Sequence, residues 1–164
     1  MKKLIYLLLL VLSGSFIASF LVACDEDEDC SATTRQMMWC GVYRMSEGET
    51  PRAVKDTIPL LTVKAFGTDS TLVNKQEKVS LLDLPLRYTE ESTVFVFTYS
   101  DTEKDTIKVK HTNSPYFISL DCGYQMRQLI SEVSHTKHRL DSIYLSKSDA
   151  NNNGTENIKL FYKR

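Results

Sequence analysis

The strongest structural signal in the chain is a period of two residues in its apolar positions. Residues 93–99 (Thr-Val-Phe-Val-Phe-Thr-Tyr) gather β-branched and aromatic side chains without a helix former, which predicts a strand at least partly buried on both faces. A polar turn over residues 100–104 follows. Ile107 and Val109 then alternate with lysines, so residues 106–110 predict a second strand, antiparallel to the first. A chain with this pattern is expected to form sheets.

The same alternation recurs along most of the chain. Pro85 interrupts one alternating segment, which places that strand at a sheet edge or a bulge. Residues 131–139 are polar and predict a loop or a short helical turn. Seven to nine short strands predict one all-β domain, an antiparallel β-sandwich of immunoglobulin-like or transthyretin-like architecture. The other expected strands cover residues 35–43, 61–65, 82–88, 116–122, 143–145 and 158–160, with turns at residues 67–69, 113–115 and 151–154.

The first 24 residues predict an export signal. Lys2 and Lys3 precede an unbroken apolar run over residues 4–12, and the alternative is an uncleaved transmembrane anchor, since the apolar segment approaches the roughly 20 residues that span a bilayer. The sequence Leu-Val-Ala-Cys that ends at Cys24 resembles the lipobox of bacterial lipoproteins. This resemblance implies cleavage before Cys24 and acylation of that residue, whose acyl chains would anchor the protein stably in a membrane.

These predictions divide the chain into a signal peptide that is removed (1–23), a lipidated acidic tether (24–34) and a β-sandwich domain (35–164). Residues 25–29 are five consecutive carboxylates. One interpretation is a solvated spacer, kept open by repulsion between like charges. The string also resembles the acidic export signal of many Bacteroidota lipoproteins, which implies display on the outer face of the outer membrane.

The charge balance argues against a nucleic-acid partner. Without Lys2 and Lys3, 18 basic side chains face 21 acidic ones, so the mature chain carries a net charge of about −3. Binding to phosphates needs a clustered basic surface, and the sequence has no run rich in Lys and Arg. We therefore expect partners other than nucleic acid.

The cysteine count fits export. With Cys24 lipidated, Cys30, Cys40 and Cys122 remain, which predicts one disulfide and one free thiol. Cys122 is expected on the apolar face of a strand, and pairing it with Cys30 would close a loop of about 90 residues and stabilise the fold by roughly 4 kcal/mol. We favour this pair over Cys40 with Cys122 and over three free thiols. A nucleophilic Cys40 would need a base and a lowered pKa, and the sequence indicates neither.

Several of these features together resemble a known family. The chain resembles small Bacteroidota cell-envelope lipoproteins that are catalogued only as a domain of unknown function. The resemblance rests on the spacing of the acidic string, Cys30, the strand that begins at Arg35, the segment 84–87, the Asp-Cys-Gly-Tyr element at 121–124 and the terminal strand 158–162. The resemblance implies an exported β-domain with no assigned activity and no catalytic residues. Cys40 departs from the family pattern.

The sequence offers little catalytic chemistry. His135, His138 and Asp141 are spaced three residues apart and would share one side of a helix as metal ligands, but their segment is polar and predicts no helix, so we expect no metal. The sequence contains no nucleophile elbow, no phosphate-binding glycine loop and no zincin helix. We therefore predict that the protein is not an enzyme and uses no cofactor.

Four aspartates are each followed by a hydroxyl residue and then by Ile or Thr, a pattern that resembles the O-glycosylation acceptor of exported Bacteroidota proteins. The alternative is local turn chemistry, because Asp, Ser and Thr bond to the backbone at strand starts. The candidate acceptors are Thr57, Ser70, Thr106 and Ser142.

Two function classes follow. The first is a structural or accessory lipoprotein that docks on another outer-membrane protein through an exposed sheet face or edge, with an apolar patch expected around Phe95, Phe97 or Phe161. The second is a surface module that binds glycan at a concave aromatic site near Trp39, the one tryptophan of the chain.

Overall fold

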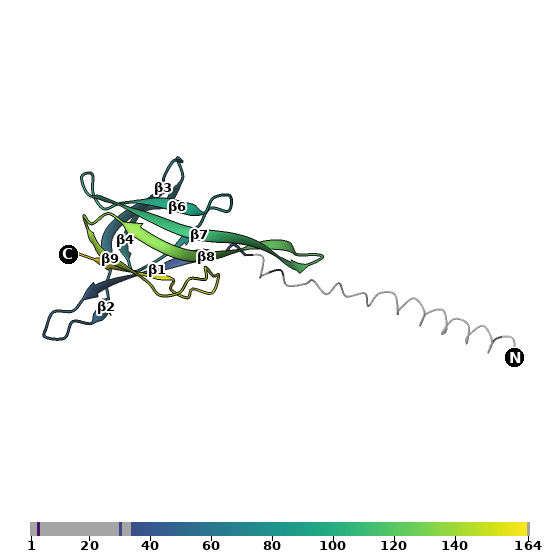
Figure 1. Cartoon of the computed structure of the whole chain (residues 1–164), viewed down its shortest axis with the longest axis horizontal. Helices are drawn as coiled ribbons and strands as arrows, with labels where there is room; N and C mark the ends of the chain where they lie inside the picture. Colours follow the sequence, from purple (N-terminus) through teal and green to yellow (C-terminus); the bar gives the residue numbers. More distant parts are fainter. Residues whose placement is uncertain (1–2, 4–29, 31–33, 164) are drawn as a thin grey trace.

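The computed structural model describes Lys3, Cys30 and residues 34–163, and residues 34–163 form an all-β fold of two sheets around one core (Figure 1). The predicted signal peptide, Cys24 and the acidic string lie outside the described residues and stay predictions. Within the described part of the chain, no helix combines the length and hydropathy that a membrane span requires.

The first sheet joins the two ends of the domain. Its order is β2-β1-β10-β9, and β5 pairs with the first half of β1 on the same side as β2. β1 and β10 run parallel, with Cys40 opposite Ile158, so the prediction of purely antiparallel pairing is wrong at this pair. Pro85 lies in β5, whose one partner among the described strands is β1, which confirms its expected edge position. The strands are β1 (Met37–Met45), β2 (Ala53–Lys55), β5 (Leu81–Pro85), β9 (Leu140–Leu145) and β10 (Ile158–Tyr162).

The second sheet is antiparallel throughout, in the order β4-β3-β6-β7-β8. The hairpin predicted from residues 93–110 is confirmed, with Phe95 opposite Ile107 in the β6–β7 pair. β2, β4 and β8 were not predicted, and β4 is an exposed edge strand whose alternation is broken by left-handed backbone at Lys75 and Lys78. The strands are β3 (Ile58–Ala65), β4 (Thr71–Val79), β6 (Ser92–Thr98), β7 (Lys104–Ser119) and β8 (Gly123–His135).

The core lies between the sheets, and β6 shows how the alternation fills it. Phe95 and Phe97 are fully buried, whereas Val94 and Val96 are half-buried on the opposite face of the strand. The predicted surface patch around Phe95 and Phe97 is therefore wrong, because the side chains of a strand alternate and the larger pair took the inner face. Phe161 is half-buried in β10, against Tyr43.

Strands β7 and β8 continue past the core as a long hairpin that protrudes from the body (Figure 1). The turn predicted at residues 113–115 is wrong, because β7 runs through these residues to Ser119 and Pro115 stands opposite Met126. The loop predicted from residue 131 is also wrong as far as His135, where β8 ends. The actual turn lies between Ser119 and Gly123, at the far end of the hairpin.

Candidate functional site

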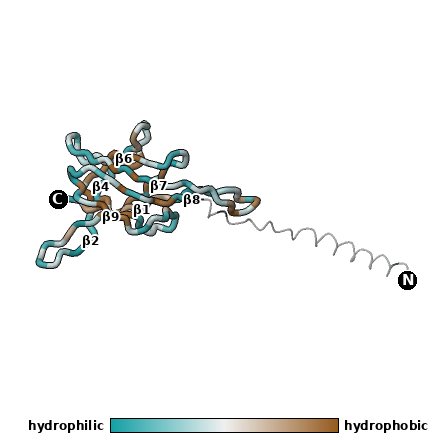
Figure 2. The backbone as a smooth tube through the Cα atoms, in the orientation of Figure 1, coloured by the Kyte–Doolittle hydropathy of each residue, from teal (hydrophilic) through white to brown (hydrophobic). Residues whose placement is uncertain are grey.

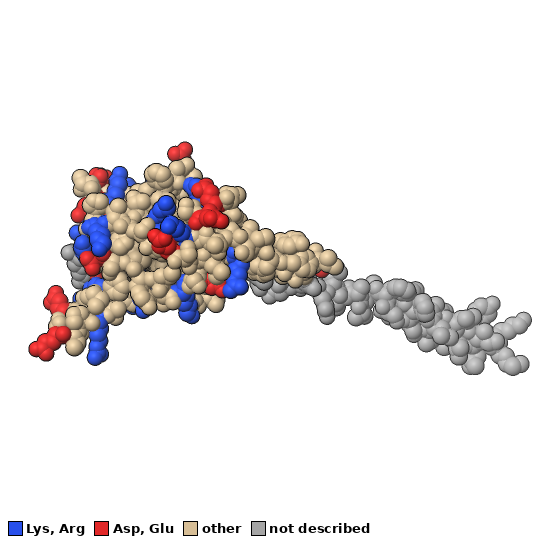
Figure 3. Space-filling view, in the orientation of Figure 1, with Lys and Arg blue, Asp and Glu red and all other residues tan. Residues whose placement is uncertain are grey.

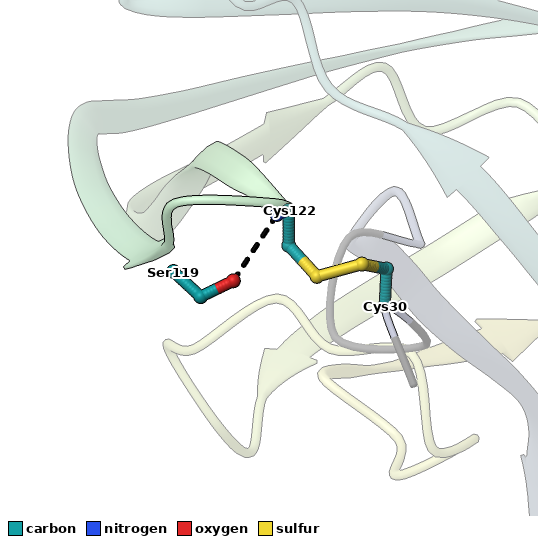
Figure 4. The surroundings of a disulfide bond; sticks show 3 residues. All are labelled: Cys30, Ser119 and Cys122. Atoms are coloured by element: carbon teal, nitrogen blue, oxygen red, sulfur yellow. Dashed lines mark hydrogen bonds between the residues drawn. A yellow bond between two sulfur atoms is a disulfide. The ribbon is translucent and has the colours of Figure 1, made fainter. Parts of the chain in front are cut away.

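A disulfide joins Cys30 to Cys122, the pairing that the sequence favoured (Figure 4). The two Cα atoms lie 5.5 Å apart. Cys122 was expected on the inner face of a strand, but it lies in the turn of the hairpin. Its backbone N–H donates to Ser119 Oγ at 3.1 Å. Gln125 Nε2 donates to the carbonyl oxygen of Thr34 at 2.9 Å. The segment before β1 is thus tied to the hairpin at two points.

The end of this hairpin is apolar and exposed. We call residues 116–124 the hairpin tip. Phe117 and Tyr124 pack edge to face with ring centroids 5.3 Å apart, yet both remain largely exposed. Figure 2 shows the hydrophobic colour at the far end of the hairpin, well outside the core. The exposed fractions are 37% for Tyr116, 52% for Phe117, 93% for Leu120 and 74% for Tyr124.

A second exposed surface lies on the outer face of the second sheet. Val94 and Val96 form its centre, and the register places Lys64 beside Val96 and Lys108 beside Val94. Phe66, which is 60% exposed, stands at one end, between shallow hollows of about 360 and about 300 Å³. We call this surface the outer face; its members are Thr62, Lys64, Phe66, Val94, Val96, Thr98, Lys104, Thr106 and Lys108.

A third feature is a hollow of about 630 Å³ between the hairpin and the loop that joins β9 to β10. Tyr116 lines this hollow, together with asparagines of the loop and the Arg127–Asp149 ion pair at 2.7 Å. Trp39 is half-buried, and its indole N–H donates to the carbonyl oxygen of Asn151 at 3.0 Å. The aromatic ring that lines the hollow is therefore Tyr116 rather than Trp39.

A comparison with family models places the chain. The model described as a family of unknown function (DUF6452) matches residues 60–162. The chain belongs to DUF6452. The expected membership of a family of unknown function is thereby confirmed, whereas the Bacteroidota and lipoprotein aspects of that expectation stay predictions. No curated protein and no solved structure matches the chain.

Cys40 of this DUF6452 chain is a core residue. Its side chain is fully buried, and the thiol lies 3.7 Å from the carbonyl oxygen of Met38. Burial, with smaller contributions from Asp83 and Glu156, raises the pKa of the Cys40 thiol far above its ordinary value. The thiolate that a nucleophile needs is strongly disfavoured here.

The four predicted O-glycosylation sites differ in exposure. Ser70 and Ser142 are exposed, whereas Thr57 and Thr106 are half-buried. Asp105, which precedes Thr106, is buried and has a structural role. Its carboxylate accepts hydrogen bonds from Thr136 Oγ1 at 2.7 Å and from three backbone N–H groups at 2.8 to 2.9 Å, those of His138, Arg139 and Leu140. Turn chemistry therefore explains this Asp, and modification of the hydroxyl residues stays a prediction.

A buried polar network around His111 was missed from the sequence. His111 Nδ1 lies 3.0 Å from Asn113 Oδ1, and because the Asn113 amide nitrogen donates to three backbone carbonyls, Nδ1 must carry the proton. Nε2 then accepts from Thr93 Oγ1 at 2.9 Å. Burial lowers the pKa of His111, so the imidazole is neutral. The sequence did contain a signal for a buried His111, because His111 continues the alternating positions of Ile107 and Val109, which face the core.

The histidines and aspartate once considered as metal ligands do not converge. His138 Nδ1 lies 3.3 Å from Asp105 Oδ1, while His135 Nε2 lies 3.3 Å from the backbone oxygen of Asp141. Across Lys3, Cys30 and residues 34–163, no three His, Cys, Asp or Glu side chains are grouped so that they could hold a metal ion.

Proposed function

We propose that this chain is a cell-envelope lipoprotein of non-enzymatic, accessory role that docks on another outer-membrane protein. The proposal also includes a Bacteroidota source, lipidation at Cys24 and display on the outer membrane. These three points rest on the sequence of residues 1–29, of which the structure describes Lys3 alone. It also includes an immunoglobulin-like or transthyretin-like type of sandwich. The observation that carries the proposed docking is the composition of the outer face.

The outer face combines an apolar centre with a basic rim. Val94, Val96 and Phe66 supply the apolar part, on a sheet surface that no described element covers. Both hollows beside Phe66 are shallow, and a broad shallow face suits a protein partner better than a small molecule, which needs a deep pocket. The proposed partner therefore presents an apolar contact to this face.

The rim defines the charge of that partner. Three exposed lysines surround the two valines (Lys64, Lys104 and Lys108), and the carboxylate of Glu90 beside Phe66 is paired with Arg87. A partner surface with carboxylates around an apolar centre would match them, since complementary charge sets the orientation and speed of docking. A lipid anchor at Cys24 would confine the domain to one membrane, which raises its effective concentration toward proteins of that membrane.

The test is crosslinking with mass spectrometry on membranes of the native host, with a tagged full chain that retains Cys24. We expect a reproducible crosslink to one outer-membrane protein, through residues of the outer face. Phe66→Glu is expected to abolish it. Tyr144→Glu is the matched control, because Tyr144 has the same 60% exposure but lies on β9 of the other sheet. Equal crosslinking by both variants, or no specific crosslink in a folded and acylated chain, would overturn the proposal.

Glycan binding is the second candidate, and the hollow beside Tyr116 favours it. An aromatic ring next to planar amide and guanidinium groups is a surface on which a sugar can stack and form hydrogen bonds. A glycan that binds the folded chain would raise its melting temperature, and Tyr116→Ala would remove the rise. A glycan panel that leaves the melting temperature unchanged would remove this candidate.

O-glycosylation at Thr57, Ser70, Thr106 or Ser142 is also part of the proposal. Thr106 stands on the outer face, opposite Val96, so a glycan there would cover the proposed docking surface. Intact mass and peptide mass spectrometry of the protein from its host would distinguish glycosylation of this face from docking of a partner on it. Sugar on Thr106 would count against docking, whereas sugar on the exposed Ser70 or Ser142 would leave the face open.

A further inference from the structure

The hairpin tip differs in chemistry from the other turns of the domain. From Thr112 to Met126 the one charged side chain is Asp121. By contrast, the β6–β7 turn at residues 100–103 reads Ser-Asp-Thr-Glu, and the β3–β4 turn contains Asp69. In Figure 3, charged side chains of both signs are scattered over the visible face of the body, while the protruding hairpin is almost free of them. A cluster of large apolar side chains exposed at the end of a protrusion is typical of a surface that binds another protein or a membrane.

The covalent structure of the protein indicates which partner. The disulfide holds Cys30 against the turn that contains Cys122 (Figure 4). Cys24 precedes Cys30 by six residues, and six residues span at most about 20 Å even when fully extended. This step rests on the proposed lipidation of Cys24. If Cys24 is held at the bilayer surface, Cys30 must lie within that distance of the lipid headgroups, and the Cα atom of Cys122 in the hairpin tip lies 5.5 Å from that of Cys30.

The side chains of the tip match such a location. Tyr116 and Tyr124 combine an aromatic ring with a polar hydroxyl, the type of residue that is enriched at the level of the headgroups. Phe117 and Leu120 supply apolar surface for the acyl boundary below. Gly123 adopts a φ of 70°, in the left-handed region that glycine favours, so the turn is tight and keeps its end narrow.

We infer that the tip of the β7–β8 hairpin inserts into the interfacial region of the bilayer and acts as a second membrane contact beside the lipid. Tyr116, Phe117, Leu120 and Tyr124 are the inserting side chains. Two contacts fix the orientation of the domain, which a single attachment point does not. The hairpin then stands on the membrane, and the outer face is directed along the membrane plane, toward other proteins of the same membrane.

The test uses tryptophan emission of the full acylated chain in vesicles of phosphatidylcholine with brominated acyl chains, which quench nearby indoles. Leu120→Trp places the probe at the tip, and Tyr144→Trp is the control, an exposed aromatic on β9 in the body. Wild type gives the background of Trp39, which is half-buried in β1. We expect brominated lipid to remove most of the added emission of Leu120→Trp and to leave that of Tyr144→Trp unchanged.

The two proposals fail in different ways. If the chain carries acyl groups and floats with the vesicles, but Leu120→Trp is quenched no more than Tyr144→Trp, the membrane contact is overturned and the lipid anchor stands. If the mass shows no acyl group on Cys24, the anchor fails, and the membrane contact fails with it because its distance argument is lost. A photo-crosslinker at position 120 that captures one protein in native membranes, without quenching in vesicles, would assign the tip to a protein partner instead and overturn the inference.

Discussion

Strand β7 can be compared with itself, because its first half lies in the body of the domain and its second half forms one side of the protruding hairpin. In the body, alternate residues from Asp105 to His111 are buried, and the strand pairs with β6 and β8. From Ser114 to Ser119 no residue is buried, and β8 is the one neighbour among the described strands. The same backbone pairing is therefore stabilised by burial in one half and by a disulfide at the end of the other.

The largest expected difference in stability is between removing a phenylalanine ring from the body, next to the first half of β7, and removing one from the hairpin tip. Phe97→Ala deletes a fully buried ring opposite Asp105 and is expected to lower the free energy of unfolding by about 3–5 kcal/mol. Phe117→Ala, in the tip, removes a ring that is 52% exposed and is expected to cost less than about 1 kcal/mol. Urea unfolding of both variants measures the difference. Equal losses would show that the tip is part of the cooperative core.

Removing the disulfide tests what holds the tip. The Cys30→Ala, Cys122→Ala double variant frees a loop with a sequence separation of 92 residues and is expected to lose about 2–4 kcal/mol of stability. Reduction of wild type should have the same effect, while the double variant should not respond to reductant. Amide hydrogen exchange should rise in residues 114–124 more than in the body. Uniform exchange along β7 and β8 would contradict the division into halves.

A smaller effect is expected at the start of β7. Asp105→Asn keeps the shape of the side chain but replaces the carboxylate with a neutral amide. The oxygen that accepts from the Arg139 and Leu140 N–H groups then either becomes an NH2 group, which cannot accept, or remains a weaker, uncharged acceptor. Bonds to a charged acceptor are the stronger kind, so we expect a loss of about 2 kcal/mol in thermal or urea unfolding. Asp101→Asn, in the exposed β6–β7 turn, is the control and should change stability by less than about 0.5 kcal/mol.

The smallest effect depends on pH and comes from His111, at the boundary between the halves. Burial lowers the pKa of folded His111 below the value of about 6.5 that it has in the unfolded chain, and the Asn113 hydrogen bond only partly offsets this. The unfolded chain therefore binds the proton first, so this contribution to stability is complete above about pH 6.5 and declines as the pH falls below it.

The slope for one proton cannot exceed about 1.4 kcal/mol per pH unit. His111→Gln should flatten the dependence of unfolding free energy on pH between about pH 7 and about pH 5.5. An unchanged slope in this variant would show that His111 already binds its proton in the folded state.

The body of the fold could be predicted from the sequence because burial on one face leaves an alternating pattern. Residues 93–110 have that pattern, and their hairpin is confirmed. The alternation stops at Asn113, Ser114 and Pro115, so these residues read as a turn, whereas the alternating residues 116–122 predicted a strand, of which β7 contains residues 116–119. Pro115 is tolerated there because the strand has a neighbour on one side only, and a missing N–H on the open side costs no ladder bond. The polar residues of β8 misled for the same reason, since an exposed edge strand and a loop share one composition.

The candidate surfaces could be predicted less well. Sequence alone does not say which of two apolar sets in β6 faces inward, so Phe95 and Phe97 were expected on the surface that Val94 and Val96 form. The hollow beside Tyr116 depends on contacts between β8 and a loop that are distant in sequence, such as the bridge between Leu129 and Asp149. The Cys30–Cys122 pair was favoured because Cys122 was expected on the inner face of a strand and the bridge would close a long loop; the pair is present, although Cys122 lies in a turn.

The disulfide at the hairpin tip also has a mechanical consequence. A pull on the chain before Cys30 reaches the domain at Cys122, in the turn of the β7–β8 hairpin, as well as at the start of β1. Such a force is shared by β7 and β8, which meet at this turn, and passes from β7 to β6 through seven register pairs. The disulfide therefore spreads a pull at this end of the chain over the longest of the described strands as well as over β1.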